Sequence, residues 1–280
     1  MSVPHDLLRA LAIFAAGLAA GTINTVVGSG TLITFPTLLA FGYPPVLANV
    51  SNNVGLVPGV ASGVYGYRSE LGGQRRRLIR LGSASVCGGL VGAILLLTLP
   101  QSAFQAIVPA LIGVAVVMVI VQPRLAKWVA ERQRARAALA DPDGTAAAIG
   151  AGAEAASADS SGEAIGGPVL WVLVFAAGIY GGYFGAAQGV LLIGMLGIAL
   201  NDSLQRINAA KNVLAGLVNG LAAVVFILAT HIDWGVAGLI AAGSIIGGQI
   251  GARIGKRLPP WGLRVVIVCV GTAALVKLLA

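Results

Sequence analysis

The stretch Ser85-Val-Cys-Gly-Gly-Leu-Val-Gly-Ala93 recurs as Ser244-Ile-Ile-Gly-Gly-Gln-Ile-Gly-Ala252, which is an offset of 159 positions from 85 to 244. The same offset aligns Gly28-Ser29-Gly30 with Ala187-Gln188-Gly189, Asn49 with Asn208, Asn53 with Asn212, and Leu99-Pro100 with Leu258-Pro259. With two residues gapped, Gly17 and Gly21 fall on Gly178 and Gly182. Such self-similarity is the signature of a duplicated architecture, so the chain is predicted to consist of two repeats.

The composition places both repeats in a membrane. Of 280 residues, 57% are hydrophobic and 10% are charged, and the mean hydropathy is +0.90. Apolar runs approach the length of about 20 residues that spans a bilayer, and strand-length alternation is absent. The predicted fold class is therefore an all-α polytopic membrane protein. The net charge of +8 comes from basic clusters between apolar runs, as the positive-inside rule describes, so nucleic-acid binding is not expected.

Each repeat divides into five predicted helical segments. They span 7–27, 30–41, 46–66, 76–98 and 103–122 in the first repeat (1–123), and 168–186, 189–200, 204–229, 234–255 and 261–279 in the second (168–280). The second segment of each repeat holds only about twelve residues, roughly 18 Å, against a hydrocarbon core of about 30 Å. These short segments are predicted to be broken or re-entrant helices, a pattern that points to a transporter binding site.

Basic residues predict opposite orientations for the two repeats. The loop between the third and fourth segments is Arg-rich at 68–80 but lacks Lys and Arg at 231–234. The next loop does the reverse, being uncharged at 98–102 and basic at 253–264. The repeats are therefore predicted to be inverted. Placing the polar linker 124–167 in the cytoplasm and both termini outside puts fifteen of the eighteen Lys and Arg on the cytoplasmic side of a bacterial inner membrane.

Polar residues and glycines gather at the break between the first and second segments of each repeat. The candidate binding residues there are Asn24, Ser29, Gly30, Thr31, Gln188 and Gly189. Glycines let the backbone open, and the amides at the following helix N-terminus carry a partial positive charge that suits an anion. The alternative is that these glycines only allow close packing of helices.

The third segment of each repeat carries the second group of candidates. Asn49 and Asn53 share a helix face, and so do Asn208 and Asn212. Lys211 is predicted to lie roughly 12 Å deep, where an ammonium costs at least a few kcal/mol and no carboxylate reaches comparable depth. The missing counter-ion is therefore expected to be a small anionic substrate. The alternatives are a lysine that snorkels to the surface and one that donates to helix carbonyls.

No catalytic constellation is visible in the sequence. Cys87 and Cys269 each stand alone in an apolar run, and His231 and Asp233 have no further ligand nearby. We therefore expect no enzymatic activity, no catalytic residue, no metal site and no cofactor. The expected partners are the lipid bilayer and the anion, and a homodimer is one alternative for the oligomeric state.

These motifs resemble the TauE/SafE sulfite exporters, also grouped as the 4-toluenesulfonate uptake permeases. The resemblance rests on Gly21-Thr-Ile-Asn-Thr-Val-Val-Gly-Ser-Gly-Thr-Leu-Ile-Thr-Phe-Pro36, on Ala48-Asn49 through Asn53, and on the echoes Gly185-Ala-Ala-Gln-Gly189 and Asn208-Ala-Ala-Lys211-Asn212. It covers both repeats and implies a secondary transporter of sulfite, sulfonates or related sulfur oxyanions, in either direction. Export is favoured because each negative charge that leaves a negative interior gains about 2.3 kcal/mol per 100 mV. A channel-like anion pore and an ion-coupled uptake permease for organosulfonates are the alternatives.

Overall fold

The computed structural model describes residues 5–140, 163–200 and 202–254, together with 265, 267–272 and 275–276. In this described part of the chain the regular structure is helical and contains no strand. Its elements are α1 (His5–Val26), α2 (Thr31–Ala40), α3 (Pro45–Gly66), the 3-10 helix η1 (Arg68–Leu71), α4 (Arg75–Thr98), α5 (Gln101–Ala140), α7 (Glu163–Tyr183), α8 (Gln188–Ala199), α9 (Leu204–Ala229) and α10 (Trp234–Ile254).

Helix length and apolarity together confirm the all-α polytopic membrane class. Among the described residues, five helices are long and apolar enough to cross a membrane, namely α1, α4, the Gln101–Arg124 part of α5, α9 and α10. The helices α2 and α8 hold 10 and 12 residues. At 1.5 Å per residue these lengths are roughly 15 and 18 Å, so neither helix crosses a core of about 30 Å alone. The two short segments predicted from the sequence are therefore present.

The helix α5 is longer than its predicted segment, 103–122. It runs for 40 residues and continues through Pro123 as far as Ala140, beyond the predicted end of the first repeat. Its extension is rich in Ala, Arg and Leu, which favour helix. Most of the segment predicted at 261–279 lies outside the described residues, and its described positions are helical.

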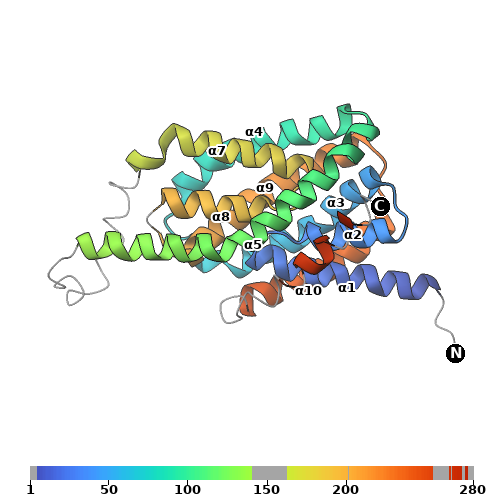
Figure 1. Cartoon of the computed structure of the whole chain (residues 1–280), viewed down its shortest axis with the longest axis horizontal. Helices are drawn as coiled ribbons and strands as arrows, with labels where there is room; N and C mark the ends of the chain where they lie inside the picture. The colour runs from blue at the N-terminus through green and yellow to red at the C-terminus, as the bar shows by residue number, and fades with distance from the viewer. Residues whose placement is uncertain are drawn as a thin grey trace.

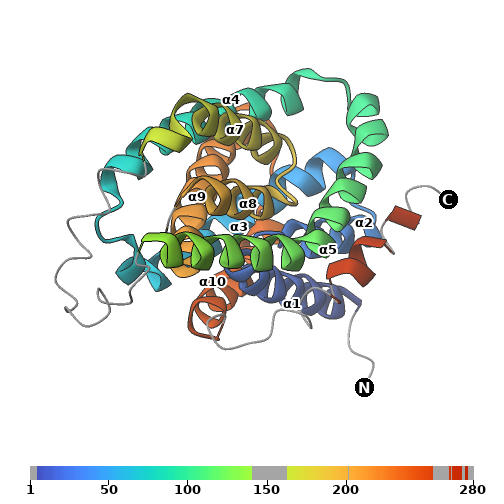
Figure 2. The same cartoon turned by 60° about the vertical axis from the view of Figure 1, so that its left-hand side comes forward.

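The first helix of each repeat packs against the fourth helix of the other. Figures 1 and 2 show α1 beside α10 and α7 beside α4, on opposite sides of the molecule, with α3, α8 and α9 between them. Small residues allow these approaches, because Gly21 lies against Ser244 and Gly178 lies against Ser85. Ser85 and Ser244 are equivalent positions, so the two halves make matched contacts.

The matched contacts correct the predicted register of the first two helices. They pair Gly21 with Gly178, an offset of 157, rather than with Gly182. The offset of 157 also holds from the start of α2 at Thr31 to the start of α8 at Gln188, whereas α3 and α9 begin 159 positions apart. The difference arises because α8 is two residues longer than α2. The predicted alignment of Gly28-Ser29-Gly30 with Ala187-Gln188-Gly189 was therefore wrong by two residues.

Two glycines on α10 provide a test of this packing. A Cβ at Gly247 would overlap the backbone oxygen of Leu18, whereas a Cβ at Gly238 would meet no atom within 4 Å. We expect Gly247→Ala to lower the stability by about 1–3 kcal/mol, because α1 and α10 must separate. Gly238→Ala should leave it unchanged or raise it by up to about 1 kcal/mol through helix propensity. Thermal unfolding of both variants in detergent checks the pair, and equal melting temperatures would contradict the proposed contact.

Candidate functional site

Each repeat opens its backbone at a glycine that ends its first helix. Gly28, just after α1, has a φ of 90°, and Gly185, just after α7, has a φ of 76°. Their amides donate back into the helix, from Gly28 to the Ile23 oxygen at 2.9 Å and from Gly185 to the Tyr180 oxygen at 3.0 Å. A positive φ at a helix C-terminus favours glycine, which has no Cβ to clash. The two breaks are therefore equivalent positions, 157 residues apart.

The two breaks touch each other at the interface between the repeats. The amide of Gly189 donates to the carbonyl oxygen of Gly28 at 3.2 Å. A Cβ on either residue would overlap the backbone of the other. Beside this contact, Phe184 packs edge-on against Phe35 with ring centroids 5.1 Å apart, and Phe104 of α5 lies 6.4 Å from Phe184. The aromatic rings hold the end of α7 against α2 and α5.

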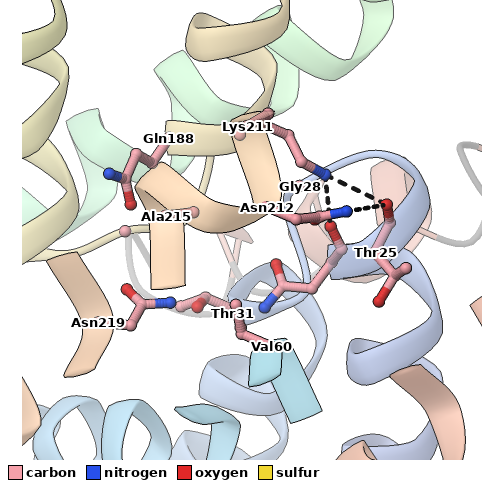
Figure 3. Close-up of a pocket in the computed structure, with 12 residues that line it drawn as sticks. Thr25, Gly28, Thr31, Val60, Gln188, Lys211, Asn212, Ala215 and Asn219 are labelled. Atoms are coloured by element: carbon pink, nitrogen blue, oxygen red, sulfur yellow. Dashed lines mark hydrogen bonds between the residues drawn. The ribbon is translucent and has the colours of Figure 1, made fainter. Parts of the chain in front are cut away.

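One face of α9 donates hydrogen bonds to the end of α1. The ammonium of Lys211 donates to the carbonyl oxygens of Asn24 at 2.9 Å and Thr25 at 3.2 Å. The amide nitrogens of Asn208 and Asn212 also donate to the Thr25 oxygen, at 3.2 and 3.4 Å. Figure 3 shows Lys211 and Asn212 converging on Thr25. Three donors from the second repeat therefore meet the last turn of a helix from the first.

The end of α1 explains how Lys211 is accommodated at 1% exposure. The last carbonyls of a helix lack partners within the helix and carry a partial negative charge, which favours a cation. The structure therefore contains one of the arrangements expected from the sequence, a lysine that donates to helix carbonyls. Within the described residues no carboxylate pairs with Lys211, and Asp202 pairs instead with Arg77 and Arg206. An ammonium has three N–H donors, so one remains after the two carbonyl bonds.

A small cavity of about 20 Å³ adjoins Lys211, enough for roughly one water molecule. Its lining residues are Asn24, Thr25, Gly28, Thr31, Val60, Gly185, Gln188, Gly189, Lys211, Asn212, Ala215 and Asn219. Three pairs among them occupy equivalent positions of the two repeats, namely Gly28 with Gly185, Thr31 with Gln188, and Val60 with Asn219. The cavity therefore lies where the repeats meet.

The polar lining of the cavity is unequal between the repeats. Lys211 and Asn212 line it, but their counterparts Asn52 and Asn53 do not. Asn52 instead donates to the hydroxyl of Thr31 at 3.4 Å. The fixed positive charge therefore belongs to the second repeat alone and lies to one side of the interface.

Gln188 contributes a second donor to the cavity. It is 2% exposed, and its Nε2 has no hydrogen-bond partner in the described structure. Gly181 makes room for this side chain, since a Cβ there would overlap it. In the first repeat the position equivalent to Gly181 is Asn24, whose Oδ1 accepts from the Gly30 amide at 2.9 Å. The two breaks thus carry their amide side chains on different helices.

Most of the candidate residues predicted from the sequence come together at the cavity. Those that line it are Asn24, Thr31, Gln188, Gly189, Lys211 and Asn212. Asn208 and Gly30 bond to lining residues. Asn49 instead donates to the Tyr183 oxygen at 3.0 Å, at the end of α7, and Ser29 and Asn53 do not line the cavity.

Sequence reasoning missed Asn219 and the backbone role of Thr25. Asn219 lies seven positions after Asn212, which is two helical turns along the same face of α9, so the signal was present. Thr25 acts through its backbone oxygen, which no side-chain pattern reveals.

The fold is that of a polytopic membrane protein with an ammonium and amide donors buried between two repeats, and the comparisons with known proteins place it among membrane transporters. The chain belongs to the sulfite exporter TauE/SafE family, whose sequence model matches residues 13–278. It is 25% identical to a probable membrane transporter protein of Haemophilus influenzae, over 91% of this chain and 87% of the relative. It is 23% identical to the probable membrane transporter protein YfcA of Escherichia coli K12, over 95% of this chain and 88% of that protein. No solved structure is significantly similar to it.

The folding role of Lys211 can be separated from a binding role by replacing it with Met. The substitution leaves the Asn24 carbonyl without its lysine donor, at a cost of about 1–3 kcal/mol. It also removes a buried charge that costs about 3 kcal/mol at the centre of a membrane helix. We therefore expect Lys211→Met to melt at the same temperature as the parent protein or higher. A clearly lower melting temperature in detergent would make Lys211 chiefly a structural tie between α9 and α1.

Proposed function

We propose that this transporter moves a small sulfur oxyanion, sulfite or a sulfonate, through a site centred on Lys211. The observation that carries the proposal is the Lys211 side chain, which lines the cavity, has no carboxylate partner among the described residues and keeps one N–H after its two carbonyl bonds. An anion there would complete the hydrogen bonding of the ammonium and balance its charge. The name of the family, sulfite exporter, supports sulfur as the central atom.

Further donors line the same cavity. Gln188 offers its unpaired Nε2, and Asn219 projects from the same helix as Lys211 (Figure 3). Gln188 is also the first residue of α8, where the helix dipole favours a negative charge. The mixture of one ammonium and neutral amides suits an anion that carries a single charge. Such a site would also accept a sulfonate, provided that space exists for its organic group.

The size of the cavity favours alternating access over an open pore. Space for roughly one water molecule does not admit an oxyanion of four heavy atoms, so the lining helices must separate before the anion binds. A channel-like pore would instead need a continuous opening wide enough for the anion. We therefore propose secondary transport, and no enzymatic activity.

Export is the proposed direction. Among the described residues no carboxylate lies in the interior of a membrane-spanning helix, so no side-chain relay for protons is evident beside the site. An anion that leaves a negative interior gains about 2.3 kcal/mol per charge and 100 mV without any coupled ion. Ion-coupled uptake of organosulfonates is the competing proposal, and it requires a dependence on a sodium or proton gradient.

The site makes a graded prediction for transport. Lys211→Met should abolish saturable flux of labelled sulfite in reconstituted vesicles, because the remaining amides are neutral. Asn219→Val makes the second repeat resemble the first at Val60, and it should raise the half-saturating concentration about tenfold, as expected for one lost hydrogen bond to a charged group. Lys127→Met, at an exposed lysine of α5, is the matched control and should transport normally.

Two measurements decide between the alternatives to this mechanism. Full sulfite flux in a folded Lys211→Met protein would overturn the assignment of the site. Unitary currents in a voltage-clamped bilayer would instead identify a channel, and flux only under an imposed sodium or proton gradient would identify coupled uptake.

The proposed orientation places the linker in the cytoplasm of a bacterium and both termini outside its inner membrane. The distribution of basic residues supports it. In a protein without Cys87 and Cys269, we expect a cysteine replacing Ser157 in the linker to react with an impermeant maleimide only in inside-out vesicles. Labelling in intact spheroplasts would reverse the orientation.

A further inference from the structure

A second cavity lies on the outer surface of the protein, away from Lys211. It is an open groove of about 410 Å³ between α4 and α9. Its lining residues are Leu71, Arg75, Leu78, Ile79, Gly82 and Leu217. On α4 the lining positions follow the spacing i, i+3, i+4 and i+7, so they form one stripe along the helix. The stripe extends for roughly 10 Å from Arg75 to Gly82.

The groove is apolar and faces outward. Ile79 is 64% exposed and Leu217 is 39% exposed, although both belong to helices that qualify as membrane spans. Gly82 forms part of the floor, and a Cβ there would lie 3.1 Å from the Cδ1 of Leu217. In a membrane a depression of this kind is filled by a hydrocarbon chain.

The end of the groove is strongly basic. Arg75 is the first residue of α4, and no acidic residue occupies the first turn of that helix. A cation is unfavourable at a helix N-terminus, whereas an anion is favourable there. Arg77 forms an ion pair with Asp202 at 2.7 Å, but Arg75 forms no hydrogen bond or ion pair with the described part of the chain. An anion beside Arg75 would satisfy both the guanidinium and the helix end.

We propose that this groove binds one anionic phospholipid, with its phosphate against Arg75 and an acyl chain along Leu78, Ile79 and Gly82. The two halves of the site have different roles. The surrounding bilayer is as apolar as the groove, so an acyl chain gains no hydrophobic free energy by entering it. The groove therefore binds the chain through its shape. Arg75 selects the charge of the headgroup, since a guanidinium pairs with the phosphate in a bidentate geometry and repels the choline cation of a zwitterionic lipid.

Two other occupants fit the groove less well. The segment 141–162 is acidic, but its one large apolar side chain is Ile149, so its composition does not match an apolar stripe. A second copy of the protein would bring its own Arg75 and Arg76 towards the same basic end if the contact were symmetric, and these charges would repel.

Native mass spectrometry of the full chain in detergent tests the proposal, with phosphatidylglycerol or phosphatidylcholine added. We expect one molecule of phosphatidylglycerol to be retained at least tenfold more tightly than phosphatidylcholine. Arg75→Ala should remove this preference. Gly82→Leu should weaken retention about tenfold by filling the groove while leaving the charge in place, and Arg75→Lys should restore part of the preference. Arg253→Ala, at an exposed arginine in the last turn of α10, is the matched control and should bind normally.

Each other outcome would overturn the lipid site. Equal retention of the two lipids by the parent protein would show that headgroup charge is not recognised. Unchanged binding in both Arg75→Ala and Gly82→Leu would place the lipid elsewhere. Loss of a dimer in Gly82→Leu without loss of lipid would make the groove an interface between copies. Thermal unfolding of each variant identifies any loss that arises from misfolding.

Discussion

The carbonyl groups at the end of α1 are the constraint on which the site depends. A helix that stops inside a membrane exposes backbone oxygens where water cannot satisfy them. In this protein a face of α9 supplies the missing donors, as an ammonium and two amides that converge on Asn24 and Thr25. The same contact joins the two repeats and holds Lys211, the only charged residue that lines the described cavity, in position. Architecture and binding chemistry therefore rest on one set of hydrogen bonds.

The two repeats solve the same backbone problem with different side chains. At the end of α7 the corresponding donor is Asn49, which reaches the Tyr183 oxygen at 3.0 Å. Asn52 is the equivalent of Lys211, and its shorter side chain does not reach as far towards the end of the opposite helix. A site built at the meeting point of two equivalent halves has thus acquired one charge instead of two. Two ammonium groups side by side would repel each other, so the inequality suits a single anion.

Much of this arrangement could be predicted from the sequence. The 159-residue offset, the short segments after the breaks and the burial of Lys211 all follow from periodicity and hydropathy. The register of the first helix could not be predicted, because glycines recur every four residues there and a shift of one turn matches equally well. The extra two residues of α8 are also invisible to an ungapped comparison. The partners of Lys211 are backbone atoms, and residue identity carries no information about them.

The contact between Gly28 and Gly189 has a mechanical consequence. Where two helical repeats meet through interlocked side chains, any rotation of one against the other must lift each side chain out of its groove. Here the two repeats meet at the cavity through bare backbone, joined by a hydrogen bond of 3.2 Å. Such a joint resists separation but offers little resistance to tilting. The hydrogen bond therefore leaves the two halves free to tilt at this point, whereas a methyl group on either glycine would overlap the opposite backbone and push the halves apart.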